Sequence, residues 1–431
     1  MTALGPARIL TVVRQLGARV TTLWLLVWAG INTGPWVLES SSSSAMASVH
    51  LVRAFLPQLA FLGAGTIALA SLSVQRFPTP FLCWLTYGVI AAVASVLSPD
   101  PWAALYWASA YLAPFAVLAL VLRSDPTLDR LILLNQLTWL GTTLVLAGLV
   151  VASGETLSEG YGAYNRMPEV GGMAMSRSSG MARFAAVPGL VAFVTMLTHR
   201  GWRVVVATPV FCLSAALIYH LQSRGAILAL ATSMLVLIAC AGRHVRAAAV
   251  VFGSITFVLW ASDLIPVGFL AEIGDHLRRG QDSEHLASLT GRTRDWEAAL
   301  IASARSPLLG FGPQADRLLI FIHVHNTYLY ALLCAGVLGL LAFVAGLVSA
   351  WSSIWRLLAR PSRPEGPFLE VIGLLAFFTV RSIPEVCGAI FGVDLLVMLP
   401  CIALVGAMDH ANRKQVTARP DRAHRERVRL V

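Results

Sequence analysis

Apolar runs of about 18 or more residues recur along the whole chain, and each is long enough to cross a bilayer. Only 13% of the residues are charged and 57% are hydrophobic, whereas soluble proteins keep about 25% charged residues. These features predict an all-α polytopic membrane protein. The first apolar run is not expected to be a cleaved signal peptide, because many further runs follow it and no convincing small-residue cleavage site is present.

We expect about twelve transmembrane helices. They cover residues 20–38, 54–74, 81–98, 102–122, 131–152, 184–199, 203–220, 225–242, 247–262, 324–355, 368–381 and 388–406. We take residues 1–410 as a single transmembrane domain.

Arginine placement gives the expected orientation, since short cytoplasmic loops collect positive charge. Most short-loop arginines fall on one side of the expected helices, and the short loops opposite hold only Arg53, Arg224 and Arg381. Both termini are therefore expected in the cytoplasm, and the long loops at about 153–183 and 263–322 in the periplasm.

The C-terminal tail, residues 411–431, supplies much of the net charge of +10. We expect this tail to be disordered and to lie near anionic lipid. No folded basic module accompanies it, so nucleic acid is not an expected partner.

The second long loop contains "LTGRTRDWEAALIASARSPLLGFGP", which predicts an amphipathic helix on the membrane face before the tenth span. Arg292 and Arg294 fall at the start of this helix, where free backbone N–H groups favour an anion. An arginine fork can hold phosphate through two hydrogen bonds, which makes both residues candidates for phosphate binding. The alternative is a pair of arginines that bind solvent or lipid headgroups.

Three further charged residues lie at the edges of expected spans. Arg224 stands at the mouth of the eighth span, where it either binds an anion or extends to the interface. Arg381 and Glu385 interrupt an apolar stretch and could pair with each other, either as a functional site or as a structural ion pair.

The stretch "FIHVHNTYLY" places His325 at the start of the tenth span. A histidine can accept a proton near neutral pH, so His325 is a candidate general base, and Asn326 could orient its ring or a substrate hydroxyl. The alternative is a hydrated interfacial histidine. His323 and His325 could also bind a metal, but we expect none, because no nearby carboxylate in the sequence supplies a third ligand. The six cysteines are scattered singly and are expected to pack in the core.

The segments "SRGAILAL" (223–230), "GRTRDWEAALIASARSPLLGFG" (291–312) and "HNTYLYALLCAGVLGLLAF" (325–343) resemble the O-antigen ligase and polymerase superfamily of bacterial inner-membrane proteins. The resemblance implies glycan transfer from undecaprenyl diphosphate to an acceptor hydroxyl at the periplasmic face, without metal or other cofactor. The acceptor would be lipid A core, another lipid-linked repeat or a protein, in lipopolysaccharide or exopolysaccharide synthesis.

Carried over residue by residue, the resemblance implies that Arg224 and Arg292 bind the diphosphate and that His325 is the base. Glu385 is similar to an acidic residue of some polymerase-like members. The family's R-x-x-G pattern in the earlier loop is matched by Arg177, although the aromatic and proline come late and the asparagine is missing. Arg183 is an equal candidate there.

Three other classes compete with this interpretation. A transporter or flippase of the lipid-linked glycan would carry polar groups at the bilayer midplane, whereas the candidates here gather on one face. A dolichol-type oligosaccharyltransferase would need acidic residues in the first outer loop, which offers only Glu39. A nucleotide-sugar transferase is disfavoured because no cytoplasmic loop contains D-x-D.

Overall fold

The computed structural model describes residues 17–31, 44–70, 77–123, 127–153, 169–170, 173–174, 178–242, 275, 292–359 and 366–429. The expected span 247–262, the candidate Arg177 and most of the two expected long loops lie outside these residues.

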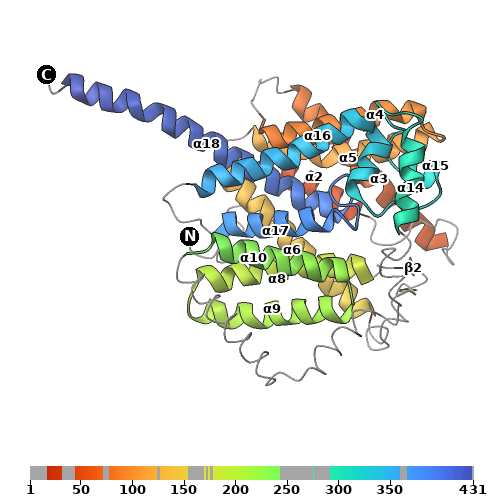
Figure 1. The fold of residues 1–431 in the computed structure, drawn as a ribbon, viewed down its shortest axis with the longest axis horizontal. Helices are drawn as coiled ribbons and strands as arrows, with labels where there is room; N and C mark the ends of the chain where they lie inside the picture. Colours follow the sequence, from red (N-terminus) through yellow and green to blue (C-terminus); the bar gives the residue numbers. More distant parts are fainter. Residues whose placement is uncertain are drawn as a thin grey trace.

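The described chain is helical apart from one two-stranded antiparallel ribbon, which confirms the all-α fold class (Figure 1). Every expected span other than 247–262 overlaps a described helix. The elements in chain order are α2 (Ala18–Ala29), α3 (Ser44–Ala70), α4 (Thr79–Ala94), η2 (Ser95–Leu97), α5 (Pro101–Leu122), α6 (Thr127–Ser153), β1 (Glu169–Val170), β2 (Met173–Ala174), α8 (Ser178–Thr198), α9 (Trp202–His220), α10 (Arg224–Cys240), α14 (Arg292–Ser303), α15 (Ala315–Leu319), α16 (Thr327–Leu358), α17 (Gly366–Arg381) and α18 (Val393–Arg429).

By length and composition, 8 of the described helices can cross a membrane. They are α3, α4, α5, α6, α8, α9, α16 and α18. The apolar helices α2 and α10 are shorter. Many large apolar side chains on the outer faces are exposed, such as Leu62, Leu144 and Leu213. Such faces suit contact with lipid rather than water.

The helices form two neighbouring groups joined by α6, α17 and α18 (Figure 1). In one group α16 packs along α4, and in the other α8 packs against α9 while α10 packs against α17. Close packing of α16 on α4 depends on Gly346, because an added Cβ there would overlap the ring of Trp84. The Trp84 ring stacks on Phe343 with centroids 4.8 Å apart and donates a hydrogen bond to the Phe343 carbonyl at 3.1 Å.

Helix α16 is interrupted at Gly336, whose backbone is non-helical with φ 61°. The loop that follows α14 packs into this break and forms backbone hydrogen bonds with the helix. The Phe311 N–H donates to the Leu333 carbonyl at 3.0 Å, and the Val337 N–H donates to the Pro307 carbonyl at 2.8 Å. A helix break within a membrane requires such partners for the backbone groups it frees. The segment "ARSPLLGFG" is therefore built into the helix bundle.

Helix α18 continues through Arg429 and projects away from the bundle (Figure 1). The expectation that residues 411–431 are disordered therefore differs from the structure over most of that range. Alanine, arginine and glutamate in "RAHRERVR" are good helix formers, and they let the helix extend beyond the packed bundle.

Candidate functional site

The loop between α17 and α18, residues 382–392, lies against the start of α16. The Thr327 N–H donates to the Ser382 carbonyl at 3.0 Å, and the Thr327 hydroxyl donates to the Glu385 carbonyl at 2.9 Å. The Cys387 N–H donates back to that hydroxyl at 2.8 Å. These bonds fix the 382–392 loop and its side chains relative to the tenth expected span.

Asn326 caps helix α16. Its side-chain oxygen accepts the N–H groups of Tyr328 at 2.9 Å and Leu329 at 3.0 Å, which otherwise lack intrahelical partners. Its amide nitrogen donates to the Ile383 carbonyl at 3.0 Å. We expected Asn326 to orient a ring or a substrate hydroxyl; in the structure its side chain instead joins the helix start to the 382–392 loop.

His325 precedes this cap and is held in the left-handed backbone region, with φ 48°. This conformation is strained for a histidine, and such strain clusters at functional sites. The ring Nδ1 lies 3.1 Å from Glu385 Oε2. Because an ionised carboxylate only accepts hydrogen bonds, Nδ1 is the donor and Nε2 keeps a free lone pair. The His325 ring is therefore available as a base.

Arg292, the first residue of α14, contacts the same loop. Its guanidinium donates to the Pro384 carbonyl and lies 3.2 Å from Glu385 Oε1. Glu385 thus bridges the two residues that the sequence resemblance marks most clearly, Arg292 and His325. Burial alone would raise the pKa of the Glu385 carboxyl, but the hydrogen bond from His325 and the charges of Arg381 and Arg292 hold that pKa well below its usual range.

The start of α10 reaches this loop as well. A Cβ added at Gly225 would lie 3.2 Å from the Pro384 ring, so only a small residue fits between helix and loop comfortably. Arg224 is the first residue of the same helix. The three segments that carry the family resemblance, far apart in sequence, therefore meet at the 382–392 loop.

Arg381 and Glu385, which we considered as a pair, each have another ion-pair partner. Arg381 is buried and lies 3.5 Å from Asp394 Oδ2, while Glu385 binds Arg292 and His325. Arg183 of α8 lies 3.2 Å from the same Asp394 oxygen. Asp394 therefore joins α8, α17 and α18 beside the 382–392 loop.

A cavity of about 330 Å³ opens at this point. We call it the arginine cavity, because Arg183, Arg317 and Arg381 line it together with His323, Glu385 and Asp394. Its remaining lining residues are Ala103, Trp107, Gln314, Leu318, Val386, Ile390, Phe391 and Gly392. Three guanidinium groups in one cavity suit an anionic ligand.

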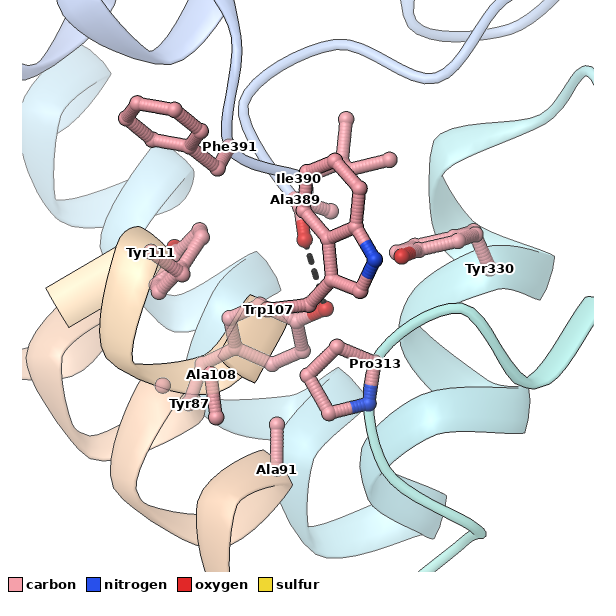
Figure 2. A pocket seen from close by; sticks show the side chains of 11 residues that line it. Tyr87, Ala91, Trp107, Ala108, Tyr111, Pro313, Tyr330, Ala389, Ile390 and Phe391 are labelled. Atoms are coloured by element: carbon pink, nitrogen blue, oxygen red, sulfur yellow. Dashed lines mark hydrogen bonds between the residues drawn. The ribbon is translucent and has the colours of Figure 1, made fainter. Parts of the chain in front are cut away.

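An aromatic pocket adjoins the arginine cavity and shares Trp107, Ile390 and Phe391 with it. Figure 2 shows the Trp107 ring in the middle of this pocket, with Tyr330 on one side and Tyr111 on the other. The Tyr87 hydroxyl donates to the Ala389 carbonyl at 2.9 Å, shown as the dashed line. Little space remains inside, about 10 Å³, so these rings form a wall rather than a second binding chamber.

His323, Asp316 and Arg317 complete the site. His323 Nδ1 lies 2.8 Å from Oδ2 of Asp316, which is fully buried. Neither Asp316 nor Arg317 could be singled out from the sequence, because the stretch "QADRLL" resembles any loop of mixed charge. Their importance follows only from the fold of the segment between α14 and α16.

Two expected site residues remain, Arg294 and Arg177. Arg294 is exposed on α14 and does not line the arginine cavity. Arg177 is outside the described residues, whereas the alternative candidate, Arg183, lines the cavity.

The expectation that no carboxylate supplies a third metal ligand is wrong. Ligand atoms of His323, His325 and Glu385 lie within 4.8 Å of one another. However, both Glu385 oxygens already have positively charged or hydrogen-bonding partners, Arg292 and His325. The neighbouring guanidinium groups also disfavour a dication. These residues are a poor fit for a resident metal ion.

The fold and the site define a multi-pass membrane protein whose candidate site residues lie together at one end of the described helices. Residues 209–344 match the family described as O-antigen ligase. All three segments named from the sequence fall within the matched residues.

The chain is also similar to the exopolysaccharide production protein ExoQ of Rhizobium meliloti (strain 1021), with 33% identity over 125 residues. This similarity covers 25% of the present chain and 27% of ExoQ. The chain thus matches about a quarter of that relative.

Proposed function

We propose that this protein is a membrane glycosyltransferase that moves a glycan from undecaprenyl diphosphate to an acceptor hydroxyl, without metal. The observation that carries the proposal is the arginine cavity, which three guanidinium groups and Glu385 line where membrane helices end, with His325 hydrogen-bonded to Glu385. The donor head is anionic and its tail is lipid, so a site at this position suits both parts.

The arginines would bind the diphosphate. Three arginines line the cavity, Arg183, Arg317 and Arg381. Contacts between arginine and phosphate are often bidentate. The diphosphate gains negative charge as the glycosidic bond breaks, and preorganised cations stabilise that change. We assign Arg292 and Arg224 to the same subsite from the sequence resemblance. The contacts of Arg292 with Glu385 and Pro384 support its placement at the rim.

His325 would remove the proton of the acceptor hydroxyl. Glu385 holds Nδ1, which leaves Nε2 to take the proton and stabilises the imidazolium that results. The attacking oxygen then bonds to the anomeric carbon, and undecaprenyl diphosphate leaves with the electron pair of the broken bond. Glu385 acts on the reaction through His325 and Arg292, and is a positioning residue.

The distribution of charge favours an enzyme over a transporter or flippase. The candidate residues lie at one end of the bundle, at the starts of α8, α10, α14, α16 and α18 and the end of α17. A transporter places its polar site near the bilayer midplane. From arginine placement in the short loops, we assign this end to the periplasmic face of the inner membrane.

Two acceptors are compatible with the site. A ligase would use lipid A core, and a polymerase would use a second lipid-linked repeat. The name of ExoQ, an exopolysaccharide production protein, favours polymer formation as the second candidate function.

A strain that lacks this protein separates the candidates. Loss of lipid A core capping with normal polymer indicates a ligase, and accumulation of single repeats indicates a polymerase. Loss of the polysaccharide together with lipid-linked glycan trapped on the cytoplasmic side would instead support a flippase.

A further inference from the structure

A second histidine–carboxylate pair, His323 with Asp316, stands beside the pair His325 with Glu385. Asp316 is completely buried, and both of its oxygens have partners: Oδ2 lies 2.8 Å from His323 Nδ1, and Oδ1 accepts the Arg317 N–H at 3.0 Å. A buried carboxylate needs such partners to persist. The proposed base, His325, makes no use of this pair.

The pair fixes the tautomer of His323. Asp316 accepts the ring proton at Nδ1, so Nε2 carries a lone pair and no hydrogen in the neutral ring. His323 therefore offers one directed hydrogen-bond acceptor. Since its side chain lines the arginine cavity, this acceptor is available to a bound molecule.

The two histidine rings lie close enough to contact the same substrate molecule. Their centroids are 4.3 Å apart and the rings meet edge to face at 72°. Ligand atoms of His323, His325 and Glu385 lie within 4.8 Å of one another. Two rings at this centroid distance can both contact neighbouring atoms of a single sugar.

We propose that His323 is an acceptor-binding residue: its Nε2 accepts a hydrogen bond from one hydroxyl of the acceptor sugar while the adjacent hydroxyl gives its proton to His325. The inference rests on the proposed function and adds the class of acceptor, a sugar with two neighbouring hydroxyls. Diphosphate oxygens are a poorer ligand for Nε2, because both groups are acceptors. Asp316 positions His323 and does not contact the sugar.

The test separates binding from turnover. Full-length protein in nanodiscs is assayed with a lipid-linked glycan donor, and the acceptor is varied: the lipid A core or the lipid-linked repeat of the deletion strain, whichever the wild type extends. We expect His323→Ala to raise the acceptor KM about tenfold, the loss of one good hydrogen bond, while kcat changes less than about threefold.

His323→Gln keeps a side-chain amide that can both donate to Asp316 and accept from the sugar, so its KM should fall between those of wild type and His323→Ala. Asp316→Asn should raise KM in the same direction, because the tautomer is no longer fixed. His199→Ala, at the far end of α8, is the matched control and should match wild type. A thermal melting curve of each variant verifies folding.

An unchanged acceptor KM in His323→Ala overturns the inference. So does a loss of kcat as large as that of His325→Ala, which would make His323 a base instead. Activity that is lost with chelator and restored by a divalent cation would make the pair metal ligands and also contradict it. If His325→Ala is fully active while His323→Ala still raises the acceptor KM, the assignment of His325 as the base is contradicted, and the role of His323 in acceptor binding is supported.

Discussion

Glu385 and His325 stand 60 positions apart in the chain, yet the carboxylate Oε2 and the ring Nδ1 lie 3.1 Å apart. The other carboxylate oxygen, Oε1, lies 3.2 Å from the Arg292 guanidinium. One acidic side chain thus orients both the proposed base and a proposed diphosphate-binding cation. Losing it should disturb two functions at once.

Glu385→Gln should lower turnover by about 10²-fold or more, since a neutral amide neither fixes the His325 tautomer nor stabilises its imidazolium. The measurement is kcat of the purified variant in nanodiscs. Glu297→Gln, an exposed acid on α14, is the control and should leave kcat unchanged. Wild-type turnover in Glu385→Gln would remove Glu385 from the site.

Arg292→Ala should abolish transfer while expression persists, and Arg292→Lys should restore it only partly, because lysine lacks the planar fork. Arg224→Ala and Arg381→Ala should also abolish transfer. The readout is glycan transfer in the deletion strain complemented with each variant, with membrane levels measured in parallel. Full transfer in Arg292→Ala would exclude this residue from the diphosphate subsite.

The lowered pKa of Glu385 predicts how stability depends on pH. A carboxyl group whose pKa is lower in the folded than in the unfolded protein stabilises the fold at pH values above its unfolded pKa, about 4.3 for glutamate. This contribution is lost as the pH falls toward the folded pKa. Wild type should therefore melt at a higher temperature than Glu385→Gln at pH 7, and the difference should begin to shrink only as the pH falls below about 4. A constant difference across this range would contradict the ionised Glu385.

Topology is the next prediction. The arginine-rich short loops predict that residues 263–322 and His325 face the periplasm. Reporter fusions after Arg279 and after Arg360 should therefore report opposite compartments. The same compartment for both fusions would contradict the orientation.

The sequence predicted the fold class and nearly every described helix, because apolar length alone determines which segments cross a membrane. It also identified Arg292, His325 and Glu385 individually. It did not predict that Glu385 joins the other two, since this contact depends on how the 382–392 loop folds onto the start of α16.

The cavity residues were harder to predict. Arg183 was only one of two candidates, and Arg317 and Asp316 carried no recognisable pattern. Asp394 begins α18 and meets Arg183 and Arg381 only after three helices pack together. A single sequence holds little information about such contacts, because charged residues at span edges are equally common as lipid anchors.

The most direct test of the central claim is turnover of His325→Ala in nanodiscs with lipid-linked donor and acceptor. The account predicts a decrease in kcat of about 10²–10⁴-fold, the usual contribution of general base catalysis. Donor binding should persist, because the arginines of the cavity remain, and chelator should have no effect on wild type. A His325→Ala variant that turns over like wild type would contradict the account.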